Sequence, residues 1–166
     1  MERRTMNTTP LRDAYRTLLE AAATVADAGD AAPPDGGWTA DQILAHVALV
    51  NAATITAVAA VASGAVATYD NRIASDTWTL SRVITLAGGN AGLRNRIRLQ
   101  GEALCALGGP ALSETELDTP VPTLLVSNGT VLVDQPLPLR DLITGLADME
   151  LPGHAQQLLA LRPGGA

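Results

Sequence analysis

The sequence predicts a mainly α-helical protein, an up-and-down four-helix bundle with a small β-hairpin before its last helix. Three observations lead to this prediction. Apolar residues make up 47% of the 166 residues, much of that fraction is alanine, and phenylalanine is absent, which favours closely packed helices over a large sheet. Apolar residues recur at helical spacing through long segments. An Asn-Gly pair joins two short β-rich runs.

The first helix is expected to begin at Thr9, a residue type that caps helices, and Pro10 suits its first turn. An apolar stripe at helical spacing continues from there to Gly29, which ends the helix. The stretch GDAAPPDGG that follows is a loop by composition. Residues 1–9 are expected to form a flexible lead-in to a single domain that covers residues 1–166.

The second helix has a clear start. Thr39 and Gln42 have the spacing of a capping box, and Trp38 and Ile43 occupy the two positions of a hydrophobic staple. The helix is expected to end at about residue 63 or 64. His46 lies one turn from Ile43, so its side chain is expected on the apolar side of the helix.

A loop over residues 69–77 is expected to lead into a third helical region, roughly Trp78 to Leu107. The glycines of GGNAG at 88–92 are expected to kink or divide it. The runs TLLV and TVLV then flank Ser127-Asn128-Gly129-Thr130, the strongest short-range hairpin signal. Since an isolated hairpin is marginal in water, this one is expected to lie against the helices.

The last helix is expected to begin near Pro138, with an apolar stripe that includes Ile143. Helical steps continued from this stripe reach Glu150, His154 and Gln157, which therefore fall on or beside the side that faces the core. An unpaired carboxylate there is costly, so the pattern calls for a partner.

Charge and composition exclude several classes of function. The net charge of −6 argues against general nucleic-acid binding, which needs cations to displace phosphate counterions. The segment 43–69 carries no formal charge, but alanine dominates it, and a buried bundle helix explains it better than a membrane span. A single cysteine, Cys105, and no signal-peptide pattern indicate the cytoplasm; a buried, inert thiol is expected.

The two histidines of the chain suggest a metal site. Each falls on the apolar face of an expected helix, and Glu150 stands four residues before His154, a spacing at which helical side chains converge. Imidazole and carboxylate groups are ligands for zinc and similar divalent ions, and three protein ligands with an open position are typical of catalytic sites. His46 is the remaining histidine and supplies the third ligand from another helix.

Two segments resemble the DinB superfamily. GGWTADQILAHVALV is similar to the segment that carries the first metal histidine of that family, and DLITGLADMELPGHAQQL is similar to its last-helix motif. Glutamate at the first of the two last-helix ligand positions resembles the metal-binding N-terminal domain of mycothiol-dependent maleylpyruvate isomerases, whose sterol-carrier-like C-terminal domain is not expected here. The helix order and the hairpin extend the resemblance over nearly the whole chain.

The resemblance implies a function. The ligands of the family map onto His46, Glu150 and His154, and the implied cofactor is a divalent metal, most simply zinc. Family members include enzymes that use a low-molecular-weight thiol, mycothiol or bacillithiol, as a nucleophile on a small electrophilic substrate. Gln157 is then a candidate to orient a ligand from outside the metal shell, although a plain surface glutamine fits the sequence as well.

Pro152-Gly153 leaves the geometry open. Proline withholds an N–H from the carbonyl of Asp148, and its ring crowds that carbonyl, so the helix must kink or restart. A mild kink keeps Glu150 and His154 together; a restart separates them. The second case favours a metal-free scaffold that binds or transforms a small molecule in a pocket between helices, with the same three residues as acid, base or polar anchors. A dimerising interaction module is a third possibility.

Overall fold

The computed structural model describes residues 5–29, 33 and 36–164. Residues 1–4 of the expected lead-in and most of the expected loop after Gly29 lie outside this part of the chain. In chain order the elements are α1 (Thr9–Ala28), α2 (Ala40–Ala62), β1 (Tyr69–Asp70), the 3-10 turn η1 (Arg72–Ser75), α3 (Thr77–Ala87), α4 (Asn90–Gly108), α5 (Glu114–Leu117), β2 (Pro120–Ser127), β3 (Thr130–Pro138), α6 (Leu139–Gly145), the π-helical turn η2 (Leu146–Glu150) and α7 (Leu151–Leu159).

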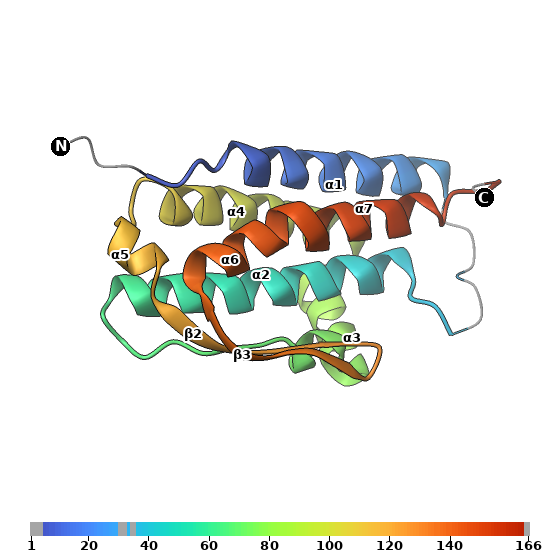
Figure 1. The fold of residues 1–166 in the computed structure, drawn as a ribbon. Helices are drawn as coiled ribbons and strands as arrows, with labels where there is room; N and C mark the ends of the chain where they lie inside the picture. The colour runs from blue at the N-terminus through green and yellow to red at the C-terminus, as the bar shows by residue number, and fades with distance from the viewer. Residues whose placement is uncertain (1–4, 30–32, 34–35, 165–166) are drawn as a thin grey trace.

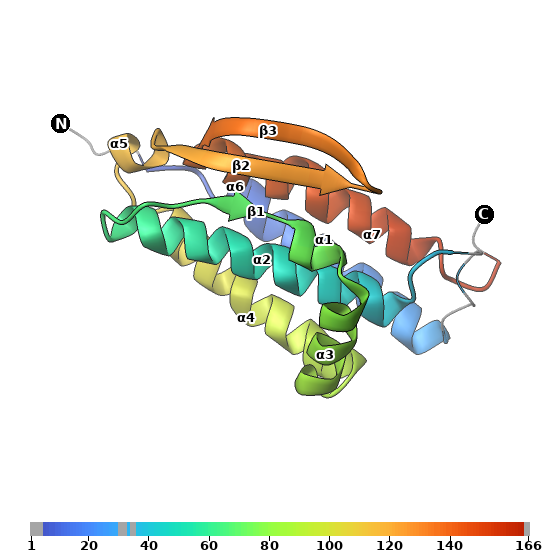
Figure 2. The ribbon, with the colours of Figure 1, turned by 90° about the horizontal axis from the view of Figure 1, so that it is seen from below.

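The protein is mainly helical, and a hairpin precedes the last helix, as the sequence predicts; a third strand, β1, extends the hairpin to a small sheet. Figure 1 shows α1, α2, α4 and the run from α6 to α7 side by side. α1 packs against α4 and α7, and α2 packs against α4. The sheet lies along one side of these helices, as Figure 2 shows from below.

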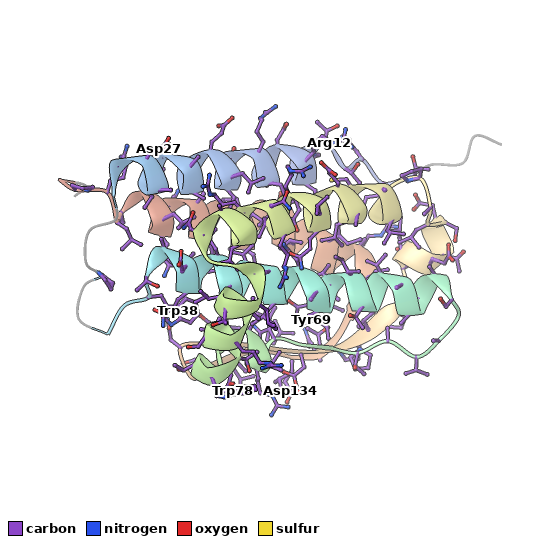
Figure 3. The ribbon with its side chains drawn as sticks, turned by 180° about the vertical axis from the view of Figure 1, so that it is seen from behind. Arg12, Asp27, Trp38, Tyr69, Trp78 and Asp134 are labelled. Atoms are coloured by element: carbon purple, nitrogen blue, oxygen red, sulfur yellow. The ribbon has the colours of Figure 1, made fainter. Side chains whose placement is uncertain are left out.

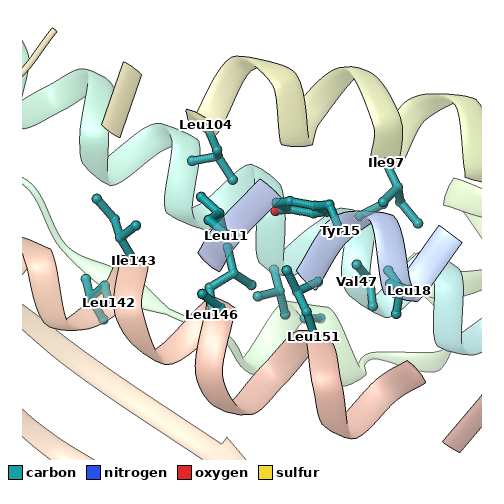
Figure 4. Packing of buried hydrophobic residues seen from close by; sticks show 14 of the residues in the cluster. Leu11, Tyr15, Leu18, Val47, Ile97, Leu104, Leu142, Ile143, Leu146 and Leu151 are labelled. Atoms are coloured by element: carbon teal, nitrogen blue, oxygen red, sulfur yellow. The ribbon is translucent and has the colours of Figure 1, made fainter. Parts of the chain in front are cut away.

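The core forms where α1, α2, α4 and the last helix meet. Figure 4 shows Leu11 and Tyr15 of α1 among leucine and isoleucine side chains of α4 and the last helix. Tyr15 packs so closely on α4 that a Cβ at Gly101 would lie 2.9 Å from its ring. Glycine at position 101 therefore sets the approach of α1 to α4.

α2 is a central helix. Over an 18-residue window its mean hydropathy is 1.9, and 61% of that window is buried inside the protein. By length and composition it is the one described helix able to cross a membrane. That is weak evidence for a span, because the core helix of a soluble protein passes the same test.

The helix starts are predicted well for α2 and less well for α1. Both hydrogen bonds of the Thr39–Gln42 capping box are present, at 3.2 and 2.9 Å. Thr9, in contrast, is the first residue of α1 and not its cap; Thr8 stands at the cap position without a side-chain bond. The carboxamide oxygen of Asn7 accepts the Thr9 N–H at 3.1 Å, so a residue further upstream satisfies that donor.

The expected third helical region is divided rather than kinked. α3 ends at Ala87 and α4 begins at Asn90, and the two residues between them, Gly88 and Gly89, have φ angles of 84° and 86°. Residues other than glycine rarely adopt this left-handed backbone conformation, so the glycine pair separates the two helices.

The hairpin has the expected turn. β2 and β3 are antiparallel, and Asn128 and Gly129 have φ angles of 50° and 76°, the two positive values of a type I′ turn. The strand β1 is not predicted: Tyr69 and Asp70 pair in parallel with Thr123 and Leu124 of β2. The expected loop before α3 therefore contains both a strand and η1. A two-residue strand has no periodicity of its own, because its partner lies more than 50 residues away along the chain.

Candidate metal centre

His46 lies in α2, and its side chain is buried, with 8% of its surface exposed. Its Nδ1 lies 2.7 Å from the carbonyl oxygen of Ala74 in η1. A carbonyl can only accept, so Nδ1 carries the proton and Nε2 presents a lone pair. The same pattern, in which a backbone carbonyl fixes the tautomer, holds histidines that ligate metals through the other nitrogen. Trp38 packs on the imidazole with its ring centroid 5.0 Å away.

The helix that carries the other two residues neither breaks nor restarts at Pro152. It widens one turn earlier: in η2 the N–H of Leu151 bonds the carbonyl of Leu146, five residues back. Glu150 and Leu151 keep helical backbone angles, with φ near −65° at both. A π turn accommodates one extra residue, and π turns frequently occur at functional sites. Pro152 then falls in the first turn of α7, where its missing N–H is tolerated.

The extra residue also shifts the buried stripe. Beyond the π turn the residues that face the core are Leu151, Ala155 and Leu158. The side chains of Glu150 and His154 lie at the edge of the core, 31% and 18% exposed, and Gln157 is exposed. Continuing a regular 3.6-residue period across η2 therefore overstates how far these polar residues point inward.

Both histidines and Glu150 meet at one point. The Oε2 atom of Glu150 lies 3.1 Å from Nε2 of His154 and 3.9 Å from Nε2 of His46. The two imidazole rings meet edge to face, 4.7 Å apart. The three possible ligand atoms all lie within 4.8 Å of one another. The fold thus brings together the three ligands that the sequence suggests. His46 comes from α2, and His154, 108 positions later, comes from the last helix.

His154 is oriented in the same way as His46. Its Nδ1 lies 2.9 Å from the Oε1 atom of Gln157, an acceptor. Both Nδ1 atoms are therefore engaged by groups outside the cluster, while both Nε2 atoms face Glu150. Gln157 has the position expected of a residue that orients a ligand.

Glu150 and His154 shift each other's pKa values, each toward its charged form. The hydrogen bond with His154, and next the nearby imidazole of His46, lower the pKa of Glu150 to about 2, although burial opposes the shift. Burial on its own lowers the pKa of His154, but its hydrogen bonds to Glu150 and Gln157 outweigh burial and raise it. Burial and then the charge of Glu150 raise the pKa of Tyr69 to about 12, so this phenol is neutral near the cluster.

The donor set fits zinc or a similar divalent ion. Two nitrogens and one carboxylate oxygen make three ligands, which leaves a fourth tetrahedral position open. Ligand atoms about 2.0–2.1 Å from a tetrahedral ion lie about 3.4 Å from each other. The distances of 3.1 and 3.9 Å from Oε2 of Glu150 to the two imidazole nitrogens bracket that value, whereas the limit of 4.8 Å for all three pairs exceeds it, so the side chains would have to draw closer together around an ion.

A cleft of about 790 Å³ adjoins the cluster. Its lining comes from the residues before α2, from η1, from the hairpin turn and from α7: Gly36, Gly37, Trp38, His46, Asn71, Arg72, Ser75, Val126, Ser127, Asn128, Gly129, Glu150, Gly153, His154 and Gln157. Figure 3 marks Trp38 beside the start of α2. Polar and apolar surfaces contribute equally to the lining, which suits a small ligand with a polar group and an apolar body.

Asn71 attaches the hairpin wall of this cleft to η1. Its side chain accepts the N–H of Val126 at 2.8 Å and donates to the carbonyl of the same residue at 3.0 Å. Its backbone carbonyl accepts the N–H of Ala74, the residue that holds His46. Asn71 therefore connects the turn of the hairpin to the segment that orients the first histidine.

Sequence reasoning missed several residues of this region. Tyr69, Asn71, Arg72 and Ala74 lie in the segment expected to be a loop, where no periodicity or motif marks them. An asparagine in a loop, such as Asn71, indicates a turn and nothing more specific. The proline itself was the available hint of the π turn, since a helix that continues through proline must rearrange the preceding turn. Cys105, in contrast, is buried as expected, and burial raises the pKa of its thiol.

No family model, curated protein or solved structure matches this chain.

Proposed function

We propose that this protein is a metal-dependent thiol transferase or isomerase, which uses a low-molecular-weight thiol such as mycothiol on a small electrophilic substrate in the cytoplasm. His46, Glu150 and His154 hold the metal, most simply zinc. The resemblance of two sequence segments to the DinB superfamily supports this function and the assignment of the single domain as a DinB-like up-and-down four-helix bundle. That family is the source of the thiol and substrate classes.

The observation that carries the proposal is the orientation of the three side chains. The ligand atoms lie within 4.8 Å of one another, and each imidazole has its Nδ1 engaged elsewhere, by Ala74 or Gln157. This leaves two Nε2 atoms and a carboxylate oxygen directed at a common point beside the cleft. The two histidines of the chain, one from α2 and one from the last helix, thus meet at one carboxylate.

A divalent ion with an open position lowers the pKa of a thiol that binds it, and so supplies a nucleophile at neutral pH. The chain contributes the surroundings. Ala74 and Gln157 accept from the Nδ1 atoms of the two imidazoles and so orient the rings, and Trp38 packs on one of them. The cleft holds the electrophile close to the cluster and orients it, which lowers the entropic part of the barrier.

Elemental analysis of untagged protein tests the metal site. We expect about one equivalent of zinc or another divalent ion per chain, and its loss in His46→Ala, Glu150→Gln and His154→Ala. Gln156→Ala is the matched control, because Gln156 is exposed on the same helix as His154 and is not among the residues that line the cleft. Protein that purifies without metal and binds none on titration would contradict the proposal.

The thiol chemistry needs a separate test. Metal-loaded protein is incubated with mycothiol and a model electrophile, monochlorobimane, and the thioether product is followed by fluorescence. We expect acceleration over the uncatalysed reaction that disappears in His154→Ala. A fully metal-loaded protein that gives no acceleration with mycothiol or with bacillithiol would argue against thiol transfer while leaving the metal site intact.

The alternative is a metal-free scaffold in which the same residues act as acid and base. The direct hydrogen bond between Glu150 and His154 favours it, because a carboxylate paired with an imidazole can move a proton without a metal. The continuous helix through Pro152, which keeps Glu150 and His154 together, favours the metal site instead. The alternative predicts that activity survives chelation. A homodimer is a further proposal, tested by light scattering.

A further inference from the structure

The cleft beside the metal cluster contains one permanent positive charge. Among the described residues that line it, Arg72 is the single arginine and Glu150 the single carboxylate. The remaining lining is neutral apart from the two histidines, and the chain as a whole carries a net charge of −6. The Arg72 side chain is 66% exposed, so it lies at the open edge of the cleft.

Arg72 is held in place by its neighbour. Its Nε donates to both carboxylate oxygens of Asp70, at 3.1 and 3.0 Å, and its Nη2 donates to one of them at 2.6 Å. The backbone N–H of Arg72 also donates to Asp70, at 3.0 Å. One edge of the guanidinium is therefore fixed by Asp70. Within the described residues its Nη1 donates no hydrogen bond, which leaves the other edge available.

The segment that carries Arg72 also serves the cluster. Arg72 begins η1, and two residues later the Ala74 carbonyl holds His46. Asn71, directly before it, is clamped to Val126 of the hairpin. The guanidinium and the first histidine are thus positioned by one short turn, fastened on both sides. A group bound at Arg72 has a defined position relative to the cluster.

We propose that the cleft binds its small-molecule substrate through a single carboxylate, which pairs with the free edge of the Arg72 guanidinium. A guanidinium matches the planar geometry of a carboxylate with two parallel hydrogen bonds. Trp38 provides an apolar wall in the same cleft for the body of the substrate. This inference rests on the proposed function only in assigning the cleft to the substrate; the carboxylate contact itself requires no metal.

The charge balance favours a monoanion over a phosphate ester. One guanidinium, already paired with Asp70, faces a cleft that also contains the carboxylate of Glu150. The two carboxylates Asp70 and Glu150 already outnumber the one guanidinium, so a dianion would add two further negative charges where a single carboxylate adds one. Phenyl phosphate is therefore expected to bind more weakly than a carboxylate of similar size.

The test is a titration followed by NMR on metal-free protein, with 3-phenylpropionate as the probe and its neutral isostere 3-phenylpropionamide as the comparison. We expect the carboxylate to bind at least about tenfold more tightly, with shifts at the Trp38 indole N–H and the Gly129 amide. Arg72→Gln is expected to remove this preference, and Arg72→Lys to retain part of it, because lysine keeps the charge and loses the fork.

Arg82→Gln is the matched control, because Arg82 lies over the ring of Trp78 on α3, does not line the cleft and should bind the carboxylate as the parent protein does. Any of four results would overturn the inference. These are equal binding of acid and amide, unchanged binding by Arg72→Gln, tighter binding of phenyl phosphate, and no binding of any probe. Because the titration uses metal-free protein, carboxylate binding without any zinc uptake would defeat the proposed function and leave this inference standing.

Discussion

Two buried polar residues of α2 have opposite surroundings. Asn51 is fully buried, and its hydrogen bonds are all made inside the protein: Tyr15 donates to its oxygen at 2.6 Å, and its amide donates to Gln100 at 3.0 Å. Gln100 in turn donates to the carbonyl of Ala48. His46 is also buried, but among the described residues only its Nδ1 is hydrogen-bonded, and its Nε2 faces Glu150 at 3.9 Å.

The difference separates a structural polar group from a candidate functional one. A closed network fixes the relative positions of α1, α2 and α4, since each donor and acceptor would be left unpaired if the helices shifted. In His46 one ring nitrogen is hydrogen-bonded, and the other, Nε2, points at a carboxylate and a second imidazole. That nitrogen is therefore positioned to bind a ligand. Burial alone does not distinguish the two cases; the direction of the remaining hydrogen-bonding group does.

The largest expected effect is on metal binding. His154→Ala removes one of three ligands, and we expect the affinity for zinc to fall at least about 100-fold. Its effect on the free energy of unfolding of the metal-free protein should be small, because the side chain lies at the edge of the core. Competition with a zinc-sensitive dye measures the affinity. An affinity unchanged by this substitution would place His154 outside the metal shell.

Asn51→Ala should have the reverse effect. It leaves the buried hydroxyl of Tyr15 and the amide of Gln100 without their partner, and we expect the free energy of unfolding to fall by about 2–3 kcal/mol. Zinc affinity of the folded fraction should change little. Urea denaturation measures the loss, with Asn95→Ala, an exposed residue of α4, as a control expected within about 0.5 kcal/mol of the parent. A loss of zinc affinity as large as that in His154→Ala would show that the two regions are coupled.

The two tyrosines lie one in each region, and both should make the fold sensitive to alkali. Burial raises the pKa of Tyr15, and burial with the charge of Glu150 raises the pKa of Tyr69 to about 12. Above pH 10 the unfolded chain loses these protons while the folded chain keeps them, so stability falls as pH rises, by about 1.4 kcal/mol per pH unit for each tyrosine.

Urea denaturation between pH 9 and pH 11 measures this fall. Tyr69→Phe should remove about half of the pH dependence, since one of the two buried phenols is then gone. Absorbance at 295 nm should show no phenolate before the fold is lost. A tyrosine that ionises near pH 10 in folded protein would contradict the burial that the structure gives it.

The smallest expected effect comes from the residue that orients His154. Gln157→Ala removes the acceptor of the Nδ1 proton, and we expect zinc affinity to fall about tenfold, since residues behind metal ligands contribute less than the ligands do. Gln157→Glu keeps an acceptor and should restore the affinity. Equal affinities in all three proteins would identify Gln157 as a surface glutamine without a role at the site.

Local signals in the sequence predict much of this fold. The capping box of α2, the Asn-Gly turn and the glycines that separate α3 from α4 each act over a few residues, and each is present. The candidate ligands also follow from local spacing: Glu150 and His154 are four residues apart, and His46 lies on the apolar face of its helix. The resemblance to a known family adds its chemistry to these residues, and the metal and the thiol stay predictions.

The sequence by itself therefore determined the helical class, the hairpin and the three candidate ligands, because the interactions behind them span one or two turns of chain. The tertiary structure alone decided how Pro152 is accommodated, since a π turn, a kink and a restart satisfy the same residues and differ in packing. It also decided that η1 and Asn71 fasten His46 to the hairpin, and that Arg72 joins the cleft. These contacts connect residues up to 55 positions apart, and no local pattern encodes such pairings.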